Sequence, residues 1–178
     1  MVHNNPAVIG SILSFISIPE KDAYKLTKEL INRGAVPCGL GCRDSLRLEA
    51  GLCLYGIDMN DKIDPITAGL LWTIGKSRRV NGGFLGYSEV MRMKDNWTQK
   101  RVGFISQGPP ARHGAKIFNT NEEEIGYVTS GTMSPILKKP ISMGYINKGY
   151  HTNDTDVLFE VRGKKYPGKV SKMPFSTL

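Results

Sequence analysis

The sequence has few cysteines and histidines and no long apolar run. Its 178 residues include three cysteines, Cys38, Cys42 and Cys53, and three histidines that are far from one another. The Cys-x-x-x-Cys spacing has no second cysteine or histidine pair at the distance of a zinc site, so it predicts reduced core cysteines and no metal. No eighteen consecutive residues are apolar, which argues against a membrane-spanning helix. Reduced cysteines favour a reducing compartment.

Blocks of like charge are also absent. The chain has 24 Lys and Arg against 16 Asp and Glu, a formal net charge of +8, but its basic residues are spread along the sequence. The lysine pairs at 138–139 and 164–165 are not interleaved with aromatic residues, as single-strand nucleic-acid binders require. We expect a diffuse basic surface that suits an anionic small molecule, and no nucleic-acid partner.

The first residues lack the two common targeting patterns. Residues 8–18 are apolar but few, and no basic flank precedes them. An Arg-rich, acid-poor amphipathic leader is not present either. We therefore expect neither a secretory signal nor a mitochondrial leader in this sequence.

The first half of the chain alternates strand and helix patterns. Residues 11–19 are rich in β-branched side chains and predict a strand, and residues 20–33 have apolar positions at helical spacing before Gly34. A second helix is predicted over residues 45–52. This alternation favours an α+β unit over a helical bundle.

Between residues 58 and 79 the pattern predicts a loop and then a buried segment. The acidic residues 58–64 are typical of a solvated loop. Residues 66–74 follow, and we expect Leu70, Leu71 and Trp72 to enter the core. From residue 79 to residue 101 the periodicity is lost.

The second half has the pattern of an antiparallel β domain. Short alternating runs separated by Gly, Pro and Asn predict a sandwich or barrel. The six predicted strands are 102–106, 116–119, 125–129, 141–146, 157–161 and 169–172. We place a domain boundary near residues 93–99, which divides the chain into residues 1–95 and 96–178.

Arg43 is the candidate binding residue. It follows Gly39-x-Gly41, where glycines allow a tight turn, and it opens a helical segment. Its guanidinium offers a planar set of donors to a carboxylate or to the edge of a planar heteroaromatic ring. From the residues alone, Arg43 either pairs with a structural carboxylate or binds a ligand.

The stretch GLGCRDSLRLEAGLCLYG over residues 39–56, followed by Asp58, Pro65, Trp72 and Gly75-Lys76, resembles aminomethyltransferase, the T-protein of the glycine cleavage system. The resemblance continues in the family's order over most of the chain. It includes residues 84–86, 101–103, 126–146 and 170–175.

This resemblance implies the C-terminal half of the family's fold. We expect an α+β chain in which part of a folate-binding α/β domain precedes an antiparallel, barrel or jelly-roll-like domain. The family transfers a one-carbon unit from the aminomethyl-lipoyl arm of the H-protein to tetrahydrofolate and releases ammonia. Its partner is thus the lipoylated H-protein, its cofactor is tetrahydrofolate as a substrate, and no metal is needed. Arg43 stands at the position of the family's folate-binding arginine.

The resemblance also implies what the sequence omits. The family's catalytic aspartate lies in an N-terminal region outside this chain, so we assign no catalytic residue here. Phe15 stands where the family has the glutamate that reads the pterin. We expect a fragment, a truncated gene model or a shortened isoform that is inactive alone, with exposed apolar surface around Leu46, Leu48, Leu70 and Leu71.

Location and alternatives follow from the same resemblance. A eukaryotic member would lie in the mitochondrial matrix and a bacterial one in the cytoplasm. The alternatives are a non-catalytic folate-domain fragment or binding module, and the folate domain of a related dimethylglycine or sarcosine dehydrogenase. The wording GLCLYGIDM over residues 51–59 is closer to the T-protein.

Overall fold

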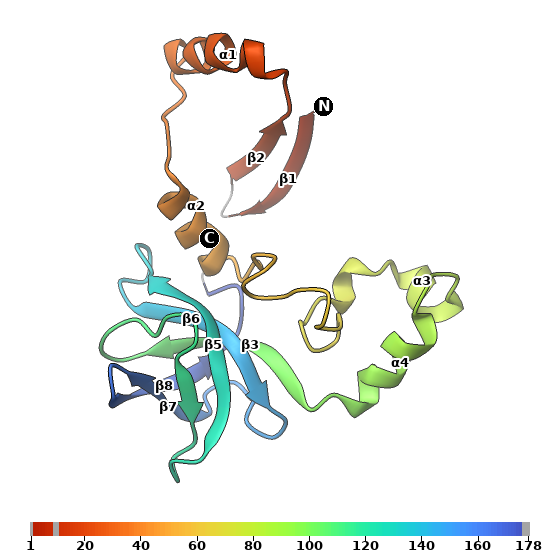
Figure 1. The fold of residues 1–178 in the computed structure, drawn as a ribbon, viewed down its shortest axis with the longest axis vertical. Helices are drawn as coiled ribbons and strands as arrows, with labels where there is room; N and C mark the ends of the chain where they lie inside the picture. Colours follow the sequence, from red (N-terminus) through yellow and green to blue (C-terminus); the bar gives the residue numbers. More distant parts are fainter. Residues whose placement is uncertain (1, 9–10, 176–178) are drawn as a thin grey trace.

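A closed β-barrel follows a run of short elements (Figure 1). The computed structural model describes residues 2–8 and 11–175, with side chains from residue 16 onward. The elements before the barrel are β1 (Val2–Val8), β2 (Ser11–Ile16), α1 (Glu20–Asn32), α2 (Leu40–Glu49), the 3₁₀ turn η1 (Leu71–Thr73), α3 (Lys76–Asn81) and α4 (Tyr87–Asn96). β1 and β2 form a two-stranded antiparallel sheet.

The barrel strands pair antiparallel in the order β3-β6-β5-β4-β7-β8, and β8 closes onto β3. Their bounds are β3 (Gln99–Ser106), β4 (Lys116–Phe118), β5 (Glu124–Met133), β6 (Pro140–Asn147), β7 (Asp156–Val161) and β8 (Lys164–Ser171). Each of the six predicted strands is present, and several are longer than the pattern indicated. The α+β fold class predicted from the sequence is confirmed.

One prediction about local structure was wrong, and two short helices were not predicted. The second helix begins at Leu40 and not at residue 45, which places Arg43 inside the helix. Residues 79–101 lack apolar periodicity, yet α3 and α4 form there. None of the residues in these two helices is buried, so no apolar stripe marks them in the sequence.

The barrel packs apolar side chains on both faces of its wall. Alternate residues of a strand point to opposite faces, so Phe104 and Ile105 of β3 join different clusters. Phe104 packs with the barrel interior, where its ring meets Phe159 edge-on at 5.4 Å between centroids. Ile105 packs outside, against Leu48 of α2 and Met143 of β6. α2 is therefore fixed to the outer face of the barrel.

Glycines allow β5 and β6 to approach closely. A Cβ added at Gly126 would stand 2.1 Å from the carbonyl oxygen of Tyr145, and one at Gly144 would stand 2.2 Å from that of Tyr127. Both distances are shorter than any real Cβ contact, so a side chain at either position would separate the strands. This close pairing positions Thr129 and Ser130 of β5 beneath α2.

α1 contributes nothing to this core. It has no buried residue, and Tyr24, Leu30 and Ile31 are exposed. Figure 1 shows it at the far end of the molecule from the barrel. The prediction of exposed apolar surface around Leu46, Leu48, Leu70 and Leu71 is wrong for Leu48, which is completely buried against the barrel wall. In the described part of the chain, no helix has the length and apolar character needed to cross a membrane.

Replacing Ile141 by Val should lower the free energy of unfolding by about 0.5–1.5 kcal/mol, because it removes one buried methylene and leaves a small cavity. Ile141 is 0% exposed, in the cluster beneath α2. Ile136→Val is the matched control, since Ile136 is 42% exposed and its change should fall within about 0.5 kcal/mol. Urea denaturation measures both. Equal values for the two variants would contradict the assignment of Ile141 to the core.

Candidate functional site

Arg43 lies in the first half of α2, which begins at Leu40 after Gly39 as its N-cap residue. Gly39 is extended, with φ −79° and ψ 172°, and Gly41 lies within the helix. A Cβ at either glycine would meet no atom within 4 Å. The predicted tight glycine corner is therefore wrong, because Arg43 is held by a regular helix.

One turn after Arg43, Arg47 anchors this helix. Residues four apart share a helix face, so both arginines point toward the same side of α2. The Arg47 side chain is 11% exposed and forms an ion pair with Asp58. Its Nη2 donates to the hydroxyl of Ser130 at 2.9 Å, and its Nε donates to Asp44 at 2.8 Å. Arg47 thus connects α2 to the following loop and to β5.

Asp58 is the centre of this network, which we call the Asp58 clamp: Arg47, Asp58, Thr129, Ser130 and Tyr145. Its Oδ1 accepts hydrogen bonds from Thr129 at 2.6 Å and from Ser130 at 2.7 Å. Its Oδ2 accepts the Leu54 N–H at 2.8 Å, besides the Arg47 guanidinium. Asp58 is 0% exposed, so the prediction that it begins a solvated loop is wrong.

Burial keeps Tyr145 of the clamp and the nearby Cys53 in their neutral forms. Desolvation raises the pKa of the Tyr145 phenol well above its ordinary value, and this phenol donates to the Asp58 carbonyl oxygen at 2.7 Å. Desolvation also raises the pKa of the Cys53 thiol. Both groups therefore stay protonated at neutral pH. Neither has the low pKa that an activated nucleophile needs.

The C-terminal end of α2 is fixed by a second buried carboxylate. Glu49 is 0% exposed, and its Oε1 accepts hydrogen bonds from the Ser134 hydroxyl and from the Ile136 N–H, the latter at 3.2 Å. Its backbone carbonyl accepts the Phe175 N–H at 2.8 Å. Both anchors, Arg47 and Glu49, lie in the C-terminal half of α2, so they fix the part of the helix that follows Arg43.

Arg43 lines a cavity of about 490 Å³ between α2, the loop after it and β5. In the described part of the chain, its guanidinium makes neither a hydrogen bond nor an ion pair, whereas Arg47 in the same motif holds the structural carboxylate. Arg112 and His113 also line this cavity. Their side chains bond to the carbonyl oxygens of Gly131 at 3.3 Å and Thr129 at 3.0 Å.

The chemistry of this cavity is that of a basic site. Arg43, Arg47, Arg112 and His113 line it, and Asp44 is its one acidic lining residue. A guanidinium with free donors, next to further cations and apolar surface from Leu54 and Ile57, fits a planar anionic ligand.

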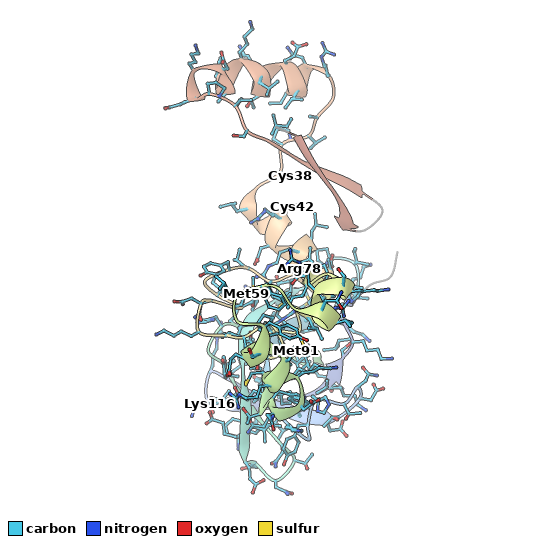
Figure 2. All side chains as sticks on the ribbon, turned by 90° about the vertical axis from the view of Figure 1, so that its right-hand side faces the viewer. Cys38, Cys42, Met59, Arg78, Met91 and Lys116 are labelled. Carbon is cyan, nitrogen blue, oxygen red and sulfur yellow. The ribbon has the colours of Figure 1, made fainter. Side chains whose placement is uncertain are left out.

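The predicted core cysteines and tryptophan lie elsewhere. Cys38 and Cys42 are exposed, on the segment that joins the N-terminal elements to the barrel (Figure 2). A hydrogen bond with Cys38 raises the pKa of the Cys42 thiol. Trp72 is 67% exposed, so its assignment to the core was also wrong. The Phe15 side chain lies outside the described residues.

All three cysteines are free thiols, and Cys53 is half-buried. No group of three or more His, Cys, Asp or Glu side chains within the described ranges could hold a metal ion.

Two sequence families match consecutive parts of the chain. The GCVT N-terminal domain matches residues 15–78, and the glycine cleavage T-protein C-terminal barrel domain matches residues 99–176. The second match begins at the first residue of β3, so it covers the closed barrel. The chain belongs to the glycine cleavage T-protein family.

Named members of the family are similar in sequence to about 90% of this chain. The mitochondrial aminomethyltransferase of Mesembryanthemum crystallinum is 52% identical over 164 residues, which are 90% of this chain and 40% of that protein. The mitochondrial enzyme of Dictyostelium discoideum is 49% identical over 170 residues. The crystal structure of aminomethyltransferase T from Bartonella henselae superposes with a TM-score of 0.83 at 36% identity, covering 89% of this chain and 45% of that one.

The chain therefore spans about 40% of the length of the curated relatives that it matches. Within the motif Arg-Asp-Ser-Leu-Arg, Arg43 was the predicted functional residue, and no role was predicted for Arg47 or its partner Asp58. The spacing of four residues between the arginines was the available signal, because it places both on one helix face. No local signal pointed to Arg112 and His113, which reach the cavity only through the fold of the barrel.

Proposed function

We propose that this chain forms the tetrahydrofolate-binding wall and the C-terminal barrel of an aminomethyltransferase. The reaction passes the one-carbon unit of the aminomethyl group on the lipoylated H-protein to tetrahydrofolate and releases ammonia. The observation that carries the proposal is the guanidinium of Arg43, which has no partner in the described part of the chain and lines a basic cavity. Tetrahydrofolate supplies both a planar ring system and carboxylates, which suit such a cation.

The proposal also includes a domain boundary, a location and a partner. We propose a domain boundary between residues 95 and 96, in α4 and just before β3. The barrel domain holds α2 through the Asp58 clamp and so fixes the orientation of Arg43. If the source is eukaryotic, the mitochondrial matrix is the proposed location, since the relatives in plants and Dictyostelium are named mitochondrial; for a bacterial source it is the cytoplasm. The lipoylated H-protein is the proposed partner.

Replacing Arg43 by Ala should weaken tetrahydrofolate binding by about 1.5–3 kcal/mol, the usual value of a hydrogen bond to a charged group. The suitable protein is a chimera in which this chain replaces the matching 40% of the Mesembryanthemum enzyme. Arg43→Lys should recover little affinity, because a point charge cannot reproduce the planar fork. Calorimetric titration of tetrahydrofolate measures the dissociation constants.

Arg92→Ala is the matched control for this experiment. Arg92 is an exposed arginine on α4 that pairs with Glu89 at 2.6 Å and lies outside the Arg43 cavity. Its replacement removes the same charge and should leave the dissociation constant unchanged. If Arg43→Ala binds as tightly as the parent chimera, Arg43 is not a folate ligand and the proposal loses its main support.

A further inference from the structure

A second cavity, of about 560 Å³, lies between the loop after α2 and the strands β3 and β8. It shares no lining residue with the Arg43 cavity. Arg101, Lys100 and Lys172 line it, and none of the described residues that line it is acidic. A cavity with three cationic residues and no carboxylate has a positive potential, which attracts anions.

Arg101 is the unusual member of this cavity, because it is buried without an acidic partner. It is 8% exposed. Its Nε donates to the Ala68 carbonyl at 2.8 Å, and its Nη1 donates to the Gly51 carbonyl at 3.1 Å and lies 3.3 Å from the Met143 sulfur. No ion pair involves Arg101 among the described residues. Buried charges are usually paired with an opposite charge, and within the described residues this guanidinium has none.

The remaining donor of Arg101 is Nη2, at the end of a side chain that lines the cavity. It makes no hydrogen bond within the described part of the chain, and it is not among the polar atoms that are sealed from solvent without a partner. A Cβ added at Gly69, which also lines the cavity, would lie 3.9 Å from Nη2. An oxyanion in the cavity can therefore reach a buried guanidinium donor directly.

The other polar lining residues also have unused capacity. Lys172 is exposed, with its backbone N–H donating to Asn153 at 3.0 Å and its carbonyl accepting the Ser171 hydroxyl at 3.3 Å, while its ammonium makes no hydrogen bond or ion pair within the described residues. The Nδ1 of His151 is buried without a partner within the described residues. The Lys100 ammonium lies 5.6 Å from the centre of the Trp97 ring. The cavity thus offers one buried guanidinium, that of Arg101, and the ammonium groups of Lys100 and Lys172.

We propose that this cavity binds an oxyanion, either a carboxylate or a phosphate group, on Nη2 of Arg101 with Lys172 at the rim. Charge-assisted hydrogen bonds from guanidinium to such oxygens are short and strong, and the partly enclosed site strengthens them. The bound anion supplies the counter-charge that Arg101 lacks. This site is separate from the Arg43 cavity and does not depend on folate binding there.

Calorimetric titration of the 178-residue chain with inorganic phosphate and with citrate, at constant ionic strength set by sodium chloride, tests the proposal. We expect saturable binding of at least one of the two anions, and the stronger one identifies the oxyanion class. Lys172→Glu should weaken that binding by roughly tenfold or more, because it places a like charge beside the anion. Absence of saturable binding by both anions would overturn the proposal.

Lys164→Glu is the matched control, since Lys164 is an exposed lysine at the start of β8, the strand that Lys172 directly follows, and lies outside the cavity. It changes the net charge equally and should alter the dissociation constant less than about twofold. An equal loss in both variants would show general electrostatic attraction only and would refute the site. Arg101→Gln should abolish binding if circular dichroism shows that it folds, and the Lys172 comparison decides the matter if it does not.

Discussion

The isolated 178-residue chain should release ammonia from aminomethylated H-protein at least about 10⁴-fold more slowly than an intact relative, a loss typical of removing a catalytic residue. The resemblance assigns the catalytic aspartate to a region that this chain lacks. α1 agrees with this expectation, because its apolar residues Leu30 and Ile31 are exposed, whereas in a complete protein we expect them to be covered. The measurement is tetrahydrofolate-dependent ammonia release at saturating H-protein.

The chimera with the Mesembryanthemum enzyme is the positive control for this assay. It restores the missing part and takes residues 16–178 from this chain, so the plant enzyme supplies the position where Phe15 replaces the pterin-reading glutamate. We expect it to turn over at a rate near that of the plant enzyme. A chain that turns over alone at a comparable rate would contradict the assignment of the catalytic residue. A chimera that binds tetrahydrofolate but does not turn over would argue for the alternative of a non-catalytic folate-domain fragment.

Replacing Asp58 by Ala should destabilise the chain by about 3–5 kcal/mol, because it leaves the buried guanidinium of Arg47 without its main counter-charge. The substitution also removes the acceptor of Thr129 and Ser130, whose hydroxyls are buried on β5. This loss is a large fraction of the stability of an ordinary domain. Urea denaturation followed by circular dichroism gives the free energy of unfolding.

Asp61→Ala controls for the loss of one negative charge. Asp61 lies in the same acidic segment but is exposed, so its replacement should change the free energy of unfolding by less than about 0.5 kcal/mol. A loss below about 1 kcal/mol for Asp58→Ala would show that the clamp contributes little. A double variant, Arg47→Met with Asp58→Leu, should lose less than the sum of the single changes, since neither charge then remains alone.

The barrel was predictable because its strands carry local signals. Period-two alternation and turn residues mark each strand, and all six were found in roughly the right places. Closure of β8 onto β3 was not predictable from any single segment, because it depends on pairing between residues such as Gly103 and Ser171 that are far apart in the sequence.

The candidate site was predicted only in part, because charge patterning describes what a segment would do alone. Asp58 belongs to an acidic run, and only the approach of Arg47 and β5 makes its burial favourable. The prediction for Trp72 was wrong in the opposite sense. Its size favours burial, but no described element covers it, and it is exposed. Arg43 was found through the motif around it, and its role as a ligand remains a prediction.

The Asp58 clamp also has a consequence for the order of folding. Its hydrogen bonds to Thr129, Ser130 and Tyr145 span 71, 72 and 87 residues of chain. Closing a loop of that length costs more entropy than forming the β5–β6 hairpin, so the hairpin should form before Asp58 docks onto it. Interactions made after the rate-limiting step slow unfolding and leave the folding rate almost unchanged. The clamp therefore acts chiefly on the lifetime of the folded chain.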